Sequence, residues 1–218
     1  MSTRPSLVVL AKSPVVGLSK TRLCPPCTLR EAAALAEASL RDTLAAVLAA
    51  PVAGRRVIVL DGARGGWLPE GVEVIAQRGA GLAQRLAAAF EDVRGPAFMI
   101  GMDTPQVDPS LLARAAHELN DAPSVFGPAR DGGYWGIGLR VANGAVFADV
   151  PMSAPDTGEV QLKRLRGLGL RPTTLPAMLD VDTFAAARVV AGQAPDGRFA
   201  ACLAQVRAAI ALRDADTR

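Results

Sequence analysis

The sequence predicts an α/β protein with an open, mostly parallel sheet and helices on both faces. Short apolar runs alternate along the chain with longer segments of helical periodicity, which is typical of that class. A length of 218 residues fits one domain, spanning 1–218, with a core of its own. Half of the residues are hydrophobic and 21% are charged, which indicates a folded and not a disordered chain.

Seven segments are predicted as strands, because each is a short apolar run bounded by turn residues. The clearest are residues 7–11 (LVVLA) and 56–60 (RVIVL). The others span 72–76, 97–101, 124–127, 135–139 and 171–175.

Six segments are predicted as helices. The helix at 28–50 begins with a capping box of Thr28 and Glu31, and the helix at 82–93 places its apolar side chains on one face. Asp108 followed by Pro109 opens the next helix, which runs to about residue 119. The other three span 159–168, 184–191 and 198–212.

The charge and the apolar patterning exclude two classes of partner. The net charge is +3 without any block of Lys or Arg, so we expect no nucleic acid partner. No apolar run reaches the ~18 residues that a membrane span needs, so we expect no membrane partner. An odd number of cysteines, three, and no export signal before the first strand predict a reduced, cytoplasmic protein.

The loop after the first strand carries three cations and a glycine in the stretch KSPVVGLSKTRL. In an open α/β sheet, ligands bind at the carboxyl ends of the strands. Lys12, Lys20 and Arg22 are therefore expected to hold phosphates, and Gly17 lets backbone amides approach a ligand closely. The stretch is not a Walker A loop, because G-x-x-x-x-G-K-[ST] is absent.

The fourth strand runs directly into GMDTP, which places Asp103 at the mouth of the same cleft. Beside phosphates, a carboxylate in that position suits a divalent metal ion. The alternative is that Asp103 caps the following turn. Since Asp108 already caps the next helix, we favour the metal.

The stretch GPARDGGYWGIG at 127–138 combines Asp131 with two glycines and two of the nine aromatic residues. Gly132 and Gly133 permit a tight turn or a close backbone approach to a ligand. The aromatic pair beside them predicts a ligand-positioning surface that includes Tyr134. The alternative is a hairpin whose two aromatic residues belong to the core.

Two carboxylates, Asp180 and Asp182, stand two positions apart in LDVDT and would point the same way from an extended segment. They could complete a metal site with Asp103. The alternative is that Asp182 or Thr183 caps the helix that follows. The sequence leaves the division of roles between Asp180 and Asp182 open.

Cysteine and histidine chemistry is disfavoured. Cys24 and Cys27 have the C-x-x-C spacing of redox proteins but do not open a helix in a thioredoxin-like unit. A zinc site would need a second pair of ligands, and the sequence has none. The single histidine, His117, lies inside a predicted helix and is expected to be exposed or packed.

The motifs AKSPVVGLSKTRL, GMDTP, GPARDGGYWGIGL and DVDT together resemble the radical-SAM/selenodomain-associated transferase family, from about residue 7 to 183. The first loop and the helix after it are also similar to 2-phospholactate guanylyltransferases and, more distantly, to molybdenum-cofactor guanylyltransferases. All of these share the GT-A, or nucleotide-diphospho-sugar transferase, fold. The resemblance implies a single three-layer α/β/α sandwich with a nucleotide over the first loop and Mg²⁺ or Mn²⁺ at Asp103.

The resemblance also implies a role for each matching residue. Asp103 would act in catalysis and, with Asp182, would ligate the metal. The residues expected to bind the nucleotide are Ala11, Lys12, Gly17, Lys20 and Arg22, of which Lys20 and Arg22 would also be catalytic. The residues expected to face a small acceptor are Asp131, Gly132, Gly133 and Tyr134.

Two reactions fit these residues. One is nucleotidyl transfer from a nucleoside triphosphate to a small phosphorylated or phosphonate acceptor. The other is transfer of a sugar from a nucleotide-sugar to a small acceptor. A lone Asp103 in place of D-x-D, and three cations in the first loop, favour nucleotidyl transfer. A nucleotide-binding protein without turnover is a third possibility, and the oligomeric state is not predicted.

Overall fold

The computed structural model describes residues 4–216, in which seven strands form one sheet in the order β3-β2-β1-β4-β6-β5-β7. Four of the six strand pairings are parallel, and β6 runs antiparallel to its neighbours β4 and β5. The strands are β1 (Ser6–Lys12), β2 (Arg56–Asp61), β3 (Glu73–Ala76), β4 (Ala97–Ile100), β5 (Ser124–Pro128), β6 (Tyr134–Leu139) and β7 (Pro172–Thr174).

Six α-helices and two short 3-10 turns complete the chain. Thr28 and Glu31 form the predicted capping box, and the Asp108 carboxylate accepts the backbone N–H of Ser110. The helices are α1 (Leu29–Ala49), α2 (Leu82–Val93), α3 (Pro109–Glu118), α4 (Thr157–Gly167), α5 (Phe184–Gln193) and α6 (Arg198–Asp216), and the 3-10 turns are η1 (Thr21–Leu23) and η2 (Gly144–Phe147). Every predicted strand and helix is present. The 3-10 turns were not predicted, because three or four residues carry no periodicity. Across residues 4–216, no helix is long and apolar enough to cross a membrane.

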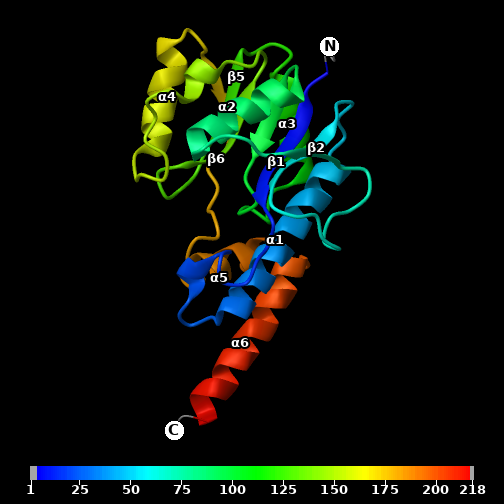
Figure 1. Cartoon of the computed structure of the whole chain (residues 1–218), viewed down its shortest axis with the longest axis vertical. Coiled ribbons are helices and arrows are strands. Elements are labelled where there is room, and N and C mark those ends of the chain that lie inside the picture. Colours follow the sequence, from blue (N-terminus) through cyan, green and yellow to red (C-terminus); the bar gives the residue numbers. More distant parts are fainter. Residues whose placement is uncertain (1–3, 217–218) are drawn as a thin grey trace.

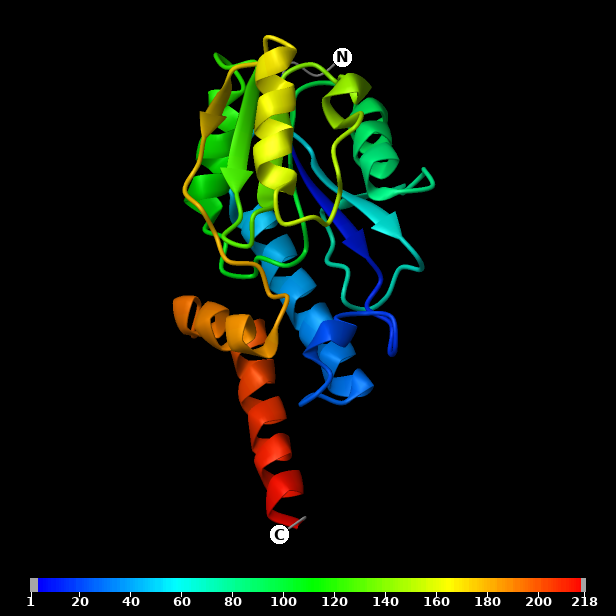
Figure 2. The same ribbon diagram turned by 90° about the vertical axis from the view of Figure 1, so that its left-hand side faces the viewer.

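The sheet lies between two layers of helices, which confirms the predicted three-layer α/β/α sandwich (Figure 2). Side chains of β1 alternate between the faces, as a strand buried on both sides requires. Leu7 and Val9 pack in the cluster that includes α1 and α3, whereas Val8 packs in the cluster that includes α2 and α4.

A third apolar cluster contains no strand residue and lies beyond the sheet, in the lower half of Figure 1. It joins the amino-terminal half of α1 to α5 and α6. Two fully buried members, Leu23 and Val181, belong to loop segments that carry predicted site residues. We refer to this region as the helical cluster. The sequence predicted its helices but not that they pack away from the sheet.

Asp42 attaches α6 to α1. The residue is only 9% exposed, and its two carboxylate oxygens accept the backbone N–H groups of Arg198 and Phe199, at 3.1 and 2.8 Å. These donors belong to the first turn of α6, where no intrahelical acceptor exists. The carboxylate on α1 therefore caps α6 from outside the helix.

Replacing Asp42 by Ala should leave the two amides at the start of α6 without acceptors. We expect a loss of about 2 kcal/mol, as for other capping groups and buried hydrogen bonds. Thermal unfolding should show a Tm lowered by roughly 4–8 °C for a chain of this size. The exposed Asp121→Ala serves as control and should change the Tm little. An equal Tm for the Asp42→Ala variant and the wild type would contradict the assignment.

Candidate active site

A cavity of about 770 Å³ opens at the carboxyl edge of the parallel strands. Its wall takes residues from the end of β1, the segment after β4, the turn between β5 and β6, and the segment after β7. The topology of the sheet predicts this convergence. The predicted site residues that line the cavity are Lys12, Arg22, Asp103, Asp131, Gly133, Tyr134 and Asp182.

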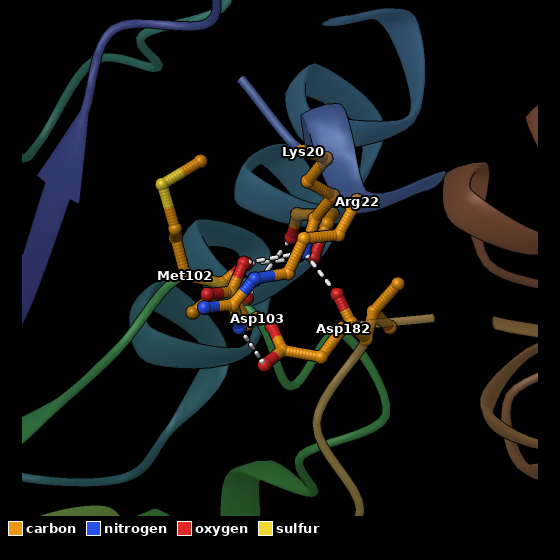
Figure 3. Close-up of polar contacts among 8 residues, drawn as sticks. Lys20, Arg22, Met102, Asp103 and Asp182 are labelled. Atoms are coloured by element: carbon orange, nitrogen blue, oxygen red, sulfur yellow. Dashed lines mark hydrogen bonds and ion pairs between the residues drawn. The ribbon is translucent and has the colours of Figure 1, made fainter. Parts of the chain in front are cut away.

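Lys20 lies behind this wall and joins two of its segments (Figure 3). Its Nζ donates to Oδ1 of Asp103 and to the carbonyl oxygen of Val181, both at 2.6 Å, and the side chain is 8% exposed. The backbone of Lys20 is left-handed, with φ 48° and ψ 37°, which is costly for a residue with a side chain. The two contacts of the ammonium group hold it in that conformation.

The Asp103 carboxylate projects from a segment whose backbone is held on both sides. The hydroxyl of Ser39, on α1, donates to the carbonyl oxygen of Met102 at 2.7 Å. The N–H of Val181 donates to the carbonyl oxygen of Asp103 at 2.9 Å. These two bonds fix the backbone on either side of the carboxylate. The carboxylate itself pairs with Lys20, and the turn-capping alternative receives no support.

Arg22 forms an ion pair with Asp182 at the cavity wall, with Nη1 3.0 Å from Oδ2 (Figure 3). The Arg22 side chain is 72% exposed, so this surface ion pair contributes little to stability. The helix α5 is capped by Thr183, whose hydroxyl accepts the N–H of Ala186 at 3.1 Å. Asp182 therefore does not cap α5, and its carboxylate pairs with Arg22 at the cavity wall.

Asp180 is the carboxylate that the structure distinguishes most sharply. The chain turns at this point, because the N–H of Asp182 donates to the carbonyl oxygen of Asp180, so the segment is not extended as predicted. Both side chains nevertheless line the cavity. Among the described residues, Oδ1 of Asp180 is buried without a hydrogen-bond partner. Burial, with the neighbouring carboxylates of Asp103 and Asp131, raises the pKa of Asp180 to about 7.

The start of β6 contributes two aromatic residues, Tyr134 and Trp135, and both line the cavity while packing against the core. Trp135 is 2% exposed, stacks edge-on against Phe98 and donates Nε1–H to Pro176, so the hairpin alternative holds for it. The ring of Tyr134 lines the cavity, while its hydroxyl is 3.5 Å from the amide oxygen of the buried Gln161. Burial raises the pKa of Tyr134, so its hydroxyl stays protonated.

Gly132 and Gly133 allow the amino terminus of α4 to approach this turn closely. The N–H of Gly158 donates to the carbonyl oxygen of Gly132 at 2.7 Å. A Cβ on Gly158 would lie 2.4 Å from the carbonyl oxygen of Gly133, and one on Gly132 would lie 1.8 Å from that of Pro155. Gly132 and Gly158 are therefore needed for backbone packing. The Asp131 carboxylate completes the turn by accepting the N–H of Gly133 at 2.9 Å.

Ala11 and Gly17, predicted to bind the nucleotide, do not line the cavity. Ala11 is buried in the sheet, and its carbonyl oxygen accepts the side-chain amide of Gln77 at 2.7 Å. Gly17 has φ +83°, a conformation that favours glycine. Their role in nucleotide binding stays a prediction.

Two wall segments were not predicted. One is the loop from β3 into α2, where Arg85 pairs with Asp61 at 2.5 Å and also approaches the side chain of Gln77. The signal was present in the Gly79-Ala80-Gly81 stretch between a strand and a helix. The other is the segment 152–157, which includes Ser153 with φ 63°. No pattern in the sequence marks it.

The cysteines belong to the helical cluster. Cys27 is 5% exposed, and burial raises its pKa to about 11. Burial also raises the pKa of Cys202. Thiols that stay protonated are poor nucleophiles, which agrees with the low weight given to redox chemistry.

The chain has the fold of the nucleotide-diphospho-sugar transferases. A candidate nucleotide-diphospho-sugar transferase from Desulfovibrio desulfuricans G20 matches with a TM-score of 0.83 at 24% identity, covering 96% of this chain and 98% of that one. A CMP:2-keto-3-deoxy-manno-octonic acid synthetase complexed with CTP matches with a TM-score of 0.57 at 13% identity, covering 88% and 99%. Rv0371c from Mycobacterium tuberculosis H37Rv, in complex with manganese, matches with a TM-score of 0.51 at 21% identity, covering 86% and 98%.

The chain belongs to DUF2064, a family of uncharacterized proteins conserved in bacteria, whose profile matches residues 34–154. No curated protein matches the chain. The similarities to radical-SAM-associated transferases and to guanylyltransferases remain predictions, because the family model and the structures above name neither group.

Replacing Gly158 by Ala should displace the Gly132–Gly133 turn, because the new methyl group would meet backbone oxygens that cannot rotate away. We expect a loss of about 1–3 kcal/mol, typical of overpacking, measured by thermal or urea unfolding. Gly167→Ala is a matched control in the same helix, since a Cβ there has no neighbour within 4 Å. That variant should equal or exceed the wild type in stability. Equal effects of the two substitutions would refute the close packing.

Replacing Asp180 by Asn should stabilise the metal-free protein at pH 8 but not near pH 4. The folded pKa of about 7 is above the usual value near 3.9, so ionised Asp180 opposes folding. This penalty is absent below about pH 4, grows as the pH rises, and is complete above about pH 7. We expect a Tm gain of several degrees at pH 8 in EDTA, and Asp121→Asn as control should show no such pH dependence. A Tm difference independent of pH would contradict the burial of an unpaired carboxyl group.

Proposed function

We propose that this chain is a metal-dependent transferase that uses a nucleotide donor, and that it moves a nucleotidyl group from a nucleoside triphosphate to a small acceptor. The observation that carries the proposal is the joining, in one cavity, of exposed cations with a group of carboxylates. The fold adds support, because one structural neighbour is a synthetase complexed with CTP.

The donor phosphates would lie among Lys12, Arg22 and Arg85. All three line the cavity. Within residues 4–216, the ammonium group of Lys12 has no hydrogen-bond or ion-pair partner and is exposed at the end of β1. Arg22 offers a planar guanidinium that can hold a phosphate with two hydrogen bonds. Arg22 and Arg85 are paired with Asp182 and Asp61, so phosphate oxygens would replace or share these carboxylates, whereas Lys12 is available directly.

The carboxylates fit a divalent cation such as Mg²⁺ or Mn²⁺. Asp103 and Asp182 line the cavity, where each is paired with a cation, Lys20 or Arg22. Asp180 adds a third carboxylate, whose buried Oδ1 has no hydrogen-bond partner among the described residues. Over the described residues, no three acidic, Cys or His side chains already form a metal-binding group. Lys20 is paired with Asp103, so binding of the cation at this carboxylate would require the ion pair to break and the ammonium group to move away. A bound cation would neutralise charge on the phosphates as the reaction proceeds.

In the proposed reaction, an acceptor oxygen attacks the α-phosphorus of the triphosphate. The bond from that phosphorus to the bridging oxygen breaks, and pyrophosphate leaves with the electron pair. A hydroxyl acceptor would pass its proton to a carboxylate of the site or to solvent. Lys12 and Arg22 would stabilise charge on the phosphate oxygens, and the cavity wall would hold the two reactants in line. On the sequence prediction, the acceptor is a small phosphorylated or phosphonate molecule.

Transfer of a sugar from a nucleotide-sugar is the second candidate. The observation that favours it is Asp131, a carboxylate on the acceptor side of the cavity that could receive a proton from a hydroxyl group. The candidate nucleotide-diphospho-sugar transferase of Desulfovibrio desulfuricans has the same fold over nearly the full length of both chains. The two reactions differ in the leaving group, which is pyrophosphate in one and a nucleotide in the other.

A thermal-shift titration of Asp103→Asn would test the proposed site. We expect the wild type to be stabilised by one nucleotide together with Mg²⁺ or Mn²⁺, by roughly 5–10 °C at ~100 times Kd. The Asp103→Asn protein should fold, because the amide oxygen can still accept from Lys20, but should lose the metal-dependent part of the shift. A full metal-dependent shift in that variant would disprove the role of Asp103.

The control is Asp121→Asn, which removes an exposed carboxylate outside the cavity and should behave like the wild type. A shift with a triphosphate alone favours nucleotidyl transfer. A shift with a nucleotide-sugar beyond that of its parent diphosphate favours sugar transfer. No shift with any nucleotide in either metal would count against the whole proposal.

A further inference from the structure

The cavity extends across the sheet, and its two ends differ in charge. In the strand order, β1 and the chain leading into α2 lie on one side of β4, whereas the turn between β5 and β6 lies on the other. We refer to these ends as the donor half and the acceptor half. Asp103, which follows β4, stands between them.

The donor half carries positive charge. Lys12 ends β1, and Arg85 belongs to the first turn of α2, after Ala80 and Gly81, which also line the cavity. Arg85 has one carboxylate partner, Asp61, so the pair is neutral, while Lys12 adds an uncompensated charge. Phosphate groups would be stabilised at this end.

The acceptor half carries negative charge. Asp131 lines it, and the β5–β6 turn and the segment 152–157, both within residues 4–216, contribute no Lys or Arg to the cavity wall. The remaining wall is apolar or uncharged, from the ring of Tyr134 to Met152 and Ser153. Arg22, at the middle of the cavity, is already paired with Asp182. A phosphate group placed beside Asp131 would meet a like charge without a compensating side chain.

The hydrogen-bonding groups of the acceptor half suit hydroxyl or ammonium donors. One oxygen of Asp131 accepts the N–H of Gly133, which fixes the carboxylate, and the other oxygen has no partner among the described residues. The hydroxyl of Ser153 also lacks a partner there, whereas that of Thr157 is used by Pro151 and Ala154. The free groups are therefore a carboxylate oxygen and a hydroxyl.

From this charge distribution we infer that the acceptor is a small hydroxyl compound without a phosphate or phosphonate group, neutral or cationic, bound through Asp131. The inference rests on the proposed function and replaces the phosphorylated acceptor that the sequence predicts. It assigns Asp131 as the residue that selects acceptors by charge, and it assigns Ser153 as a second polar contact.

Binding of matched pairs of compounds tests this inference. Each pair joins an unphosphorylated compound to its own monophosphate: glycerol and glycerol 3-phosphate, glucose and glucose 1-phosphate, ethanolamine and phosphoethanolamine, choline and phosphocholine. Titration calorimetry of the full chain, with Mg²⁺ and a non-hydrolysable triphosphate analogue, should show the unphosphorylated member of at least one pair binding about tenfold more tightly than its monophosphate.

Two variants isolate the contribution of Asp131. Asp131→Asn should weaken the unphosphorylated compound about tenfold, and Asp131→Lys should reverse the preference in favour of the monophosphate. Asp121→Lys makes the same change in net charge outside the cavity and should leave the preference unaltered. Without that control, a preference could reflect the overall charge of the protein.

Two results would overturn the inference: tighter binding of the monophosphates by the wild type, or a panel in which no unphosphorylated compound binds. The triphosphate analogue is titrated first, and failure of that step counts against the proposed function instead. Binding of the compound pairs is measured whether or not the triphosphate analogue binds. The acceptor inference and the proposed function are therefore tested separately.

Discussion

The buried ammonium group of Lys20 is the contact on which the candidate site depends. It bridges the Asp103 carboxylate and the carbonyl oxygen of Val181, and so brings together three segments that are far apart in the sequence. A cation this deeply buried is tolerated only when it is paired and hydrogen-bonded. Under the proposed function, a metal ion would use the same carboxylate, so its binding would be coupled to movement of Lys20.

The helical cluster explains how those segments are held in place. Leu23 follows Lys20 closely in the chain and Val181 lies between Asp180 and Asp182, and both are fully buried in this cluster. The helix α1 extends through both regions, covering the sheet with one half and packing on α5 and α6 with the other (Figure 1). The helical cluster therefore positions the cation of the first loop and the last two carboxylates against an edge that the sheet alone would leave open.

The distribution of charge in the cavity links the fold to its chemistry. The nucleotide-diphospho-sugar transferase fold serves several reactions, so the fold by itself does not define the substrates. Lys12 and Arg85 lie on the β1 side of the cavity and Asp131 lies on the side of the β5–β6 turn, and under the proposed function this difference would orient the donor and the acceptor. Asp103 and Asp182 are paired with Lys20 and Arg22, so the net charge at this point depends on Asp180, whose pKa is raised to about 7. A divalent cation would favour the ionised form of Asp180.

The sequence alone determined the elements of the fold, because local patterns suffice for them: the continuous apolar run of β1, the capping box of α1, and one apolar face over 82–93. It also identified the strand ends that carry Asp103 and Asp131. Tertiary structure decided the rest. Lys20 and Asp103 are 83 residues apart, and no local pattern shows that one neutralises the other. The raised pKa of Asp180 and the contact of Gly158 with the glycine turn likewise arise from burial and close approach between distant segments. Such effects depend on distance in space, which spacing along the chain does not contain.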